Sequence, residues 1–329
     1  MFQTRYPLAL KDGALTLPET GSIVVFGPAQ DANLSDLPKD RCVIVAPDFP
    51  VHAAWEKRGW TVSATPPEGA FSAAIICLPR AKALAHAWIA AASVATSGGL
   101  MVVDGQKTDG VESILKALSK KAEMQGVISK AHGKIAWLTG ADVADWAATT
   151  KVLPDGFITR PGVFSADGID KGSAALIAAL PKDIKGRVAD LGAGWGYLAH
   201  HILGHESVSE MHLVEANITA LDCARENIKD DRATFIWGDA TTHVNVTPYD
   251  LIVSNPPFHT GRKGDPDLGR AFIRAAALNV KVAGQFILVA NRHLPYEETL
   301  AEHFNEVAEI GGTPAFKVIR CAKPRRAKR

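Results

Sequence analysis

The sequence predicts an α/β protein of two tandem Rossmann-like domains, each a mainly parallel seven-stranded sheet that ends in an antiparallel hairpin. Two observations support this prediction. Short apolar runs of strand length recur in the same order in both halves of the 329 residues. In the second half, one run opens into a glycine-rich loop that is followed by a helical pattern, as at the start of such a fold. We expect the domains to be 1–150 and 151–329.

The predicted strands match one another between the two halves. Each half has five runs in the same order and then two more runs that are spaced as a hairpin. The first-half runs are 22–27, 42–46, 61–63, 73–78, 99–103, 126–129 and 134–138, and the second-half runs are 187–191, 211–214, 234–238, 250–253, 284–289, 306–310 and 316–321. With 47% hydrophobic residues, the chain is long enough to build two full cores.

A double-proline loop follows the run 250–253. It contains Asn255, Pro256, Pro257 and Phe258. Asn255 supplies a side-chain carbonyl, the backbone carbonyls before the prolines supply more acceptors, and Phe258 supplies a stacking face. Because proline fixes φ and donates no hydrogen bond, the loop keeps its shape. Asn-Pro-Pro also occurs as an ordinary turn, but this loop suits a flat group with an exocyclic amine.

The glycine-rich loop favours a cationic ligand over a dinucleotide. Gly192, Gly194 and Gly196 allow a tight turn and a close approach to a ligand. A dinucleotide motif needs glycine where Tyr197 stands, so a pyrophosphate site is disfavoured. Asp190, near the end of the preceding strand, adds a carboxylate that suits a positive charge. S-adenosylmethionine carries an ammonium and a sulfonium and no phosphate, so we predict that it is the cofactor.

Acidic residues at the next two strand ends extend the predicted cofactor site. Glu215 follows the run 211–214 and can accept hydrogen bonds from both ribose hydroxyls. Asp239 can accept from the adenine amine, while the Ala240 amide donates to the ring. One acid at such a position is more often a helix N-cap. Three at successive strand ends, with Asn255 at the fourth, favour a ligand site.

These motifs resemble those of a known family. Their order is similar to that of class I S-adenosylmethionine-dependent methyltransferases, whose amino-methylating members use Asn-Pro-Pro-Phe. The segments 161–173, 255–261 and 289–296 resemble the ribosomal small subunit methyltransferase C family more closely. The resemblance covers the second half with several specific motifs and the first half in layout only. It implies two class I methyltransferase domains in tandem.

The resemblance also implies an activity: methyl transfer from S-adenosylmethionine to the N2 amine of a guanine in small-subunit (16S) ribosomal RNA. Asn255 Oδ1 and the Pro256 carbonyl would accept from the amine and draw its nitrogen towards tetrahedral geometry, so positioning supplies most of the catalysis. Phe258 would stack on the extruded base. Phe164 and Ser165 would close over the cofactor, and the alternative for Phe164 is a packing role between the domains.

Charge indicates where RNA would bind. The net charge is +1, so the chain is no general polyanion binder. Basic residues flank the Asn255 loop, occupy the equivalent loop of the first half, and account for seven of the residues in 317–329, which include no acid. The predicted RNA contacts are Arg80, Lys82, Arg262, Lys263, Arg325 and Arg326. Solvated surface charge is an equally good interpretation of the loop residues.

The first domain lacks the residues of the predicted site. Gly27 is followed by Pro28 instead of by spaced glycines, and Leu-Pro-Arg-Ala-Lys at 78–82 replaces Asn-Pro-Pro-Phe. We therefore expect this domain to be catalytically inert and to act as a scaffold or in RNA binding.

Other functions stay open on the residues alone. Adenine-N6 and protein glutamine-N5 methyltransferases use closely similar Asn-Pro-Pro-aromatic loops. A non-catalytic RNA-binding assembly factor would keep the fold, but the intact Asp190, Glu215, Asp239 and Asn255 argue against it. A nicotinamide oxidoreductase is weakened by Tyr197.

We expect a monomeric, cytoplasmic protein that uses no metal and no membrane segment. Its partner would be ribosomal RNA or the small ribosomal subunit. The most apolar helical stretch, 83–96, is too short and too broken to span a bilayer. The four cysteines lack C-x-x-C spacing, and His200, His201 and His205 complete no zinc motif.

Overall fold

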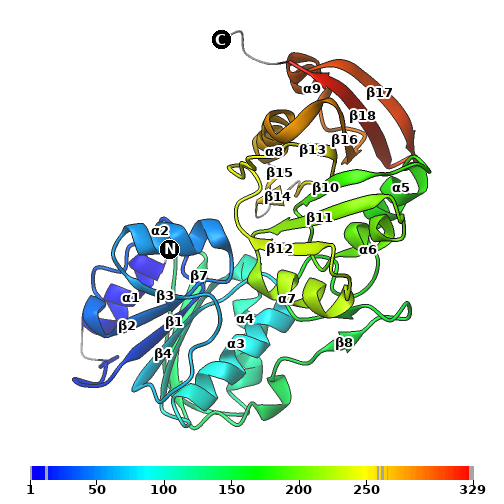
Figure 1. The fold of residues 1–329 in the computed structure, drawn as a ribbon. Coiled ribbons are helices and arrows are strands. Elements are labelled where there is room, and N and C mark those ends of the chain that lie inside the picture. The colour runs from blue at the N-terminus through cyan, green and yellow to red at the C-terminus, as the bar shows by residue number, and fades with distance from the viewer. Residues whose placement is uncertain (1, 12–13, 258, 261–262, 265, 326–329) are drawn as a thin grey trace. The chain divides into compact units, whose positions relative to one another are not determined.

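The chain forms two compact units in the computed structural model, which describes residues 2–11, 14–257, 259–260, 263–264 and 266–325 (Figure 1). The first unit comprises 1–150 and 160–162, and the second comprises 151–159 and 163–329. Each unit has its own seven-stranded sheet with helices on both faces.

The sheet of the first unit has the strand order β3-β2-β1-β4-β5-β7-β6. The first five strands in this order are parallel, and β7 runs antiparallel to both β5 and β6. Its strands are β1 Ile23–Phe26, β2 Cys42–Val45, β3 Thr61–Ser63, β4 Ala73–Cys77, β5 Leu100–Gln106, β6 Glu123–Lys130 and β7 Gly133–Thr139. Its α-helices are α1 Phe2–Lys11, α2 Phe49–Lys57, α3 Lys82–Ala95 and α4 Val111–Leu118, and its 3-10 turns are Lys39–Arg41, Lys107–Asp109 and Ala144–Trp146.

The sheet of the second unit repeats this topology, with the order β12-β11-β10-β13-β16-β18-β17. Here too the last two strands form an antiparallel hairpin. Its strands are β10 Gly186–Leu191, β11 Val208–Glu215, β12 Ala233–Trp237, β13 Tyr249–Ser254, β16 Val280–Asn291, β17 Phe304–Gly312 and β18 Phe316–Pro324. Its helices are α5 Lys171–Ala179, α6 Tyr197–Leu203, α7 Ile218–Asn227, α8 Pro266–Asn279 and α9 Glu297–His303.

Two short strand pairs accompany the second sheet. One pairs β8, Lys151–Val152, with β9, Ile158–Thr159. The other pairs β14, His259–Thr260, with β15, Lys263–Gly264, directly after the double-proline loop. Neither pair was predicted from the sequence.

Alternating strand residues feed two cores in each unit. In β1, Val24 and Phe26 pack against α3 and α4, whereas Ile23 and Val25 pack on the face that α1 and α2 cover. The second sheet is covered by α5, α6 and α7 on one face and by α8 and α9 on the other. Because successive side chains point to opposite faces and helices cover both faces, the runs are apolar throughout.

The predicted fold class is confirmed: both units are mainly parallel seven-stranded sheets with a C-terminal antiparallel hairpin. The predicted runs fall on the observed strands, and several strands extend further, as β16 does by four residues at its start. Within the described residues, no helix is both long and apolar enough to cross a bilayer.

Candidate active site

The candidate site lies where four parallel strands of the second sheet end. Because β12, β11, β10 and β13 are parallel neighbours, their carboxyl ends share one edge. The glycine loop 192–196 follows β10, Glu215 ends β11, and Asn255 follows β13. Since β10 lies between β11 and β13, the chain order reverses at β10, which is where α/β sheets open a ligand crevice.

The glycine loop has the backbone that only glycine adopts easily. Gly192, Gly194 and Gly196 have φ values of 76°, 55° and 91°. A Cβ at Gly196 would lie 2.9 Å from Ile228 Cδ1 and 3.2 Å from Ala224 Cβ, so packing as well as the positive φ favours glycine here. Around a Cβ built at Gly194 there is no atom within 4 Å, so this residue faces open space. The middle of the loop is therefore the part that a ligand can approach.

Glu215 holds the glycine loop in place. Its Oε2 accepts a hydrogen bond of 2.7 Å from Gly194 N, and its Oε1 accepts one of 2.8 Å from Asn217 N. Each carboxylate oxygen can accept more than one bond, so these contacts leave room for ribose hydroxyls. This second contribution of Glu215, which shapes the loop itself, was not predicted from the sequence.

Asp190 is completely buried, and neither of its carboxylate oxygens accepts a regular hydrogen bond. Burial, and after it the charge of Glu215, raise its pKa to about 8, with the Ala199 backbone offsetting part of the rise. A carboxyl group without a partner in such a place is costly, and groups of this kind concentrate at functional sites.

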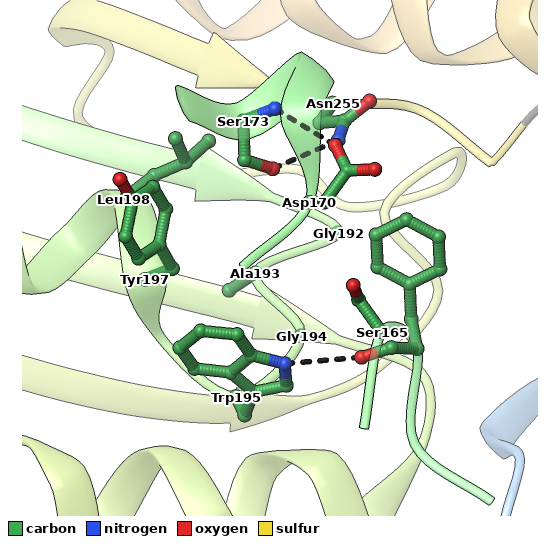
Figure 2. Close-up of a pocket in the computed structure, with 11 residues that line it drawn as sticks. Ser165, Asp170, Ser173, Gly192, Ala193, Gly194, Trp195, Tyr197, Leu198 and Asn255 are labelled. Atoms are coloured by element: carbon green, nitrogen blue, oxygen red, sulfur yellow. Dashed lines mark hydrogen bonds between the residues drawn. The ribbon is translucent and has the colours of Figure 1, made fainter. Parts of the chain in front are cut away.

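A pocket opens beside the glycine loop (Figure 2). It brings together Phe164, Ser165, the loop and Asn255, which are all predicted site residues. Its lining consists of Phe164, Ser165, Asp170, Ser173, Gly192, Ala193, Gly194, Trp195, Tyr197, Leu198 and Asn255. Asp190, Glu215, Asp239 and Ala240 lie at or near the same strand ends but do not line it.

Trp195 connects the glycine loop to the segment that precedes α5. Its indole Nε1 donates a 3.0 Å hydrogen bond to the Phe164 carbonyl, as Figure 2 shows. Ser165 has a positive φ of 52°, and its hydroxyl donates to the Gly168 carbonyl at 2.7 Å. The Phe164 side chain is 62% exposed, so it is available at the pocket instead of packed in a core of the second unit.

Asn255 is held by its side-chain nitrogen. Asn255 Nδ2 donates to Asp170 Oδ2 at 2.9 Å and to Ser173 Oγ at 2.8 Å. Pro256 is buried and Pro257 is exposed. Phe258, the predicted stacking ring, lies outside the described residues.

Asp239 and Ala240 follow β12 on the far side of β11 from the loop. Asp239 Oδ1 accepts from the Thr241 amide at 2.8 Å and from the Thr241 hydroxyl at 2.6 Å. These bonds make Asp239 the cap of the turn that follows. The contact of Asp239 with the adenine amine stays a prediction.

The predicted RNA contacts are dispersed. Arg80 and Lys82 are exposed in the first unit, next to the start of α3. Lys263 is in β15, and Arg262 and Arg326 lie outside the described residues. Arg325 follows β18, which runs antiparallel to β16, so it lies at the edge of the sheet opposite Asn255. At about 3.3 Å per strand residue, the length of the strands separates Arg325 from Asn255 by roughly 20 Å.

Comparison with known proteins places the chain in a family. Residues 155–320 match the model of the methyltransferase small domain, and residues 16–136 match that of the methyltransferase small domain N-terminal. The ribosomal RNA small subunit methyltransferase C of Shewanella pealeana is 30% identical over 266 residues, covering 77% of this chain and 78% of its own. The protein of the same name from Salmonella choleraesuis is 32% identical, covering 72% and 71%. The chain belongs to the ribosomal RNA small subunit methyltransferase C family.

A solved structure of the T. thermophilus 16S rRNA N2 methyltransferase, in complex with AdoMet and guanosine, is similar to this family member. The TM-score is 0.78 at 24% sequence identity, and the match covers 94% of this chain and 90% of the other. This likeness extends across both units and supports the tandem fold.

Six residues that line the pocket had no site role predicted from the sequence, and Asp170 and Ser173 are two of them. Asp170 and Ser173 were part of the family-like segment 161–173 but had no role assigned. Asp170 is the N-cap of α5, and its Oδ2 accepts from Ser173 N at 2.8 Å. An Asp-x-x-Ser pattern before an alanine-rich run is an N-cap signal, so the cap was predictable. Its contact with Asn255 was not.

Proposed function

We propose that the protein transfers a methyl group from S-adenosylmethionine to the N2 exocyclic amine of a guanine in 16S ribosomal RNA. The observation that carries this proposal is a single pocket that joins a glycine loop to the amide of Asn255. The glycine loop supports binding of the cofactor, and the Asn255 amide supports binding of an amine. Family membership supports ribosomal RNA as the substrate, and the name of the T. thermophilus protein supports the N2 atom.

The residues around the glycine loop fit the cofactor. Asp190 is a buried carboxylate without a regular partner, which suits a cationic ligand. Gly194 leaves space where a side chain would stand, and Glu215 is fixed beside it with oxygens that accept hydroxyl groups. When bound, S-adenosylmethionine would supply an electrophilic methyl group on a sulfonium. The electron pair of the broken C–S bond would stay on the sulfur, which becomes a neutral thioether.

The chain's own residues then have to orient a weak nucleophile. The lone pair of an exocyclic amine is delocalised into its ring. Asn255 Oδ1 and the Pro256 carbonyl are the proposed acceptors for its N–H groups, which would draw the nitrogen towards tetrahedral geometry. Pro257 stiffens the loop, and Phe258 is proposed to stack on the base at about 1–3 kcal/mol. As the new N–C bond forms, the extra proton on nitrogen passes to water.

A nucleoside assay tests the proposed product. The enzyme is incubated with methyl-labelled cofactor and small subunits, or their RNA, from a strain that lacks it, and the RNA is digested to nucleosides. We expect label in N2-methylguanosine, formed far more slowly with Asn255→Ala. Label in N6-methyladenosine, or in protein alone, would place the chain in a different methyltransferase class. Cofactor binding without any transfer would instead favour an assembly factor.

The first unit is proposed to be inert towards the cofactor. Its first strand is followed by Gly27 and Pro28 without further glycines, and no α-helix forms between β1 and β2. Calorimetry should therefore give one cofactor per chain. A stoichiometry of two would show that this unit has kept a site.

We further propose that the protein works as a monomer on ribosomal RNA or the small subunit in the cytoplasm. The residues proposed for RNA contact remain those predicted from the sequence, with Arg325 at a distance from Asn255. Among the described residues, there is no group of three or more potential metal ligands. Sedimentation of the free enzyme and of its mixture with small subunits tests both the oligomeric state and the partner.

A further inference from the structure

A three-residue hydrogen-bond cluster connects the start of α5 to the double-proline loop. Asp170 Oδ2 accepts from Ser173 N at 2.8 Å and from Asn255 Nδ2 at 2.9 Å. Asn255 Nδ2 also donates to Ser173 Oγ at 2.8 Å. Asp170 and Asn255 are 85 positions apart, so only the fold brings them together.

The chemistry of Asp170 decides which end of the Asn255 amide it contacts. An ionised carboxylate accepts hydrogen bonds and donates none. It therefore attracts the NH2 group of Asn255 and repels the carbonyl oxygen, so the reversed amide would lose a charge-assisted bond and place two oxygens together. In Figure 2 the Asn255 oxygen points away from both Asp170 and Ser173.

The acceptor is itself held firmly. Ser173 is 8% exposed, and α5 packs on β16, β17 and β18. A Cβ at residue 172 would lie 2.9 Å from Asp170 Oδ2 and 3.2 Å from the Phe316 ring, so Gly172 leaves the space that the carboxylate occupies. The helix and the sheet thus place one oxygen at a defined point beside the loop.

We propose that Asp170, assisted by Ser173, is a positioning residue that fixes the orientation of the Asn255 amide. It would keep Oδ1 directed at the target amine before substrate arrives, which spares the reaction the cost of orienting it. This proposal rests on the proposed function, because it assumes that Asn255 Oδ1 accepts from the amine.

Asp170→Asn is the discriminating change. Asparagine has the same shape and is an equally good N-cap, so α5 should keep its start. Two facing amides, however, can pair in either orientation, so Asn255 is no longer held one way. We expect kcat to fall about 10- to 100-fold, while the KM for RNA and the calorimetric affinity for S-adenosylmethionine stay within about twofold. Ser173→Ala should give a smaller fall.

Two comparisons separate positioning from stability. In an Asn255→Ala background, Asp170→Asn should lower kcat no further, because the residue it positions has gone. Asp109→Asn is the matched control. Asp109 Oδ2 caps a turn in the first unit by accepting from Gln106 N at 3.1 Å. Asp109→Asn therefore makes the same replacement of a capping carboxylate by an amide, in the other unit. Its kcat should equal that of the wild type.

Several outcomes would overturn the proposal. They are an unchanged kcat in Asp170→Asn, a further loss in the Asn255→Ala background, and a loss of cofactor affinity in place of kcat. If Asp170→Asn fails to fold, Ser173→Ala is subjected to the same cycle and decides the matter alone. The proposed function would fail differently, with Asn255→Ala as active as the wild type or with no N2-methylguanosine formed.

Discussion

The two units bury one carboxylate each among the described residues and treat it in opposite ways. In the first unit, Asp104 of β5 accepts two hydrogen bonds from the fully buried Arg5 of α1, at 2.6 and 2.7 Å. In the second, Asp190 of β10 has no regular partner. A buried carboxyl group that the protein pairs with its own cation is part of the structure, whereas one left without a regular partner suits a cation from outside. The two groups lie on different strands of the shared topology, β5 and β10, so burial alone does not identify a binding site.

The glycine loops differ in the same sense. In the second unit, loop 192–196 leads directly into α6, and Gly194 faces open space. In the first unit, the chain after β1 continues without a helix to the turn Lys39–Arg41, and the Pro28 carbonyl accepts from the buried Trp55 indole at 3.2 Å. The first loop is therefore bound to its own core.

One glycine persists in both units for packing. Trp88 and Phe272 each occupy the seventh position of their helices, α3 and α8. A Cβ at Gly27 would lie 2.3 Å from the Trp88 ring, and one at Gly192 would lie 3.2 Å from the Phe272 ring. Packing in both units thus favours a glycine after the first strand, whereas the later glycines of the loop occur in the second unit alone.

Replacing the residue that follows β13 or β4 should give the largest difference in kcat between the two units. Asn255→Ala is expected to lower kcat by about 100- to 1000-fold, because an acceptor used in the transition state is lost, with cofactor affinity changed by less than about threefold. Leu78→Met, at the matching position after β4, should leave kcat unchanged. Single-turnover methylation and calorimetry measure both. Equal losses in the two variants would remove the functional distinction between the units.

Separating the paired carboxylate from its cation should destabilise the first unit. Arg5→Met leaves Asp104 buried without compensation, so we expect the free energy of unfolding to fall by about 3–5 kcal/mol. Arg225→Met is the control, since it breaks a pair with Asp222 in which both side chains are more than 40% exposed. That change should cost less than about 1 kcal/mol. Urea denaturation compares the two, and equal costs would contradict the assignment of Asp104 to structure.

Asp190→Asn should stabilise the protein in a pH-dependent way. The pKa of Asp190 is raised in the folded state to about 8, so the native protein keeps a proton that the unfolded chain releases above pH 4. The wild type should therefore lose stability as the pH rises from about 4 to 8, and the variant should not share this loss. Melting temperatures at several pH values test this. The difference in melting temperature between the variant and the wild type should increase as the pH rises. A constant difference would mean that Asp190 does not titrate in this range.

Charge reversal at Arg80 and Lys82 should have the smallest effect. If the first unit binds RNA, the double change to glutamate should weaken RNA binding several-fold and reduce its salt dependence, with cofactor affinity unchanged. Filter binding at two salt concentrations distinguishes this from a general loss of folding. Unaltered RNA affinity would limit the first unit to a scaffold role.

Most of the fold could be predicted from the sequence because each strand is a short apolar run. The shared strand order and the common edge of Asp190, Glu215 and Asn255 follow from parallel strands alone. The contacts among side chains could not be predicted in this way. Arg5 meets Asp104 across 99 positions, a distance over which a local pattern has no bearing.

Two site residues show where such reasoning ends. Glu215 was predicted from its strand end as a ribose ligand, but its bond to Gly194 depends on the exact path of the loop. Arg325 was grouped with the RNA contacts because the end of the chain is basic. Its place opposite Asn255 results from the antiparallel direction of β18, which carries the chain back across the sheet.

That return has a practical consequence for experiments on this enzyme. The described chain ends at Arg325, on the far side of the sheet from Asn255. A fluorophore or affinity tag attached at residue 325 would therefore begin from the edge of the sheet opposite the reacting groups. Immobilisation through such a tag should leave the pocket accessible to whole ribosomal subunits.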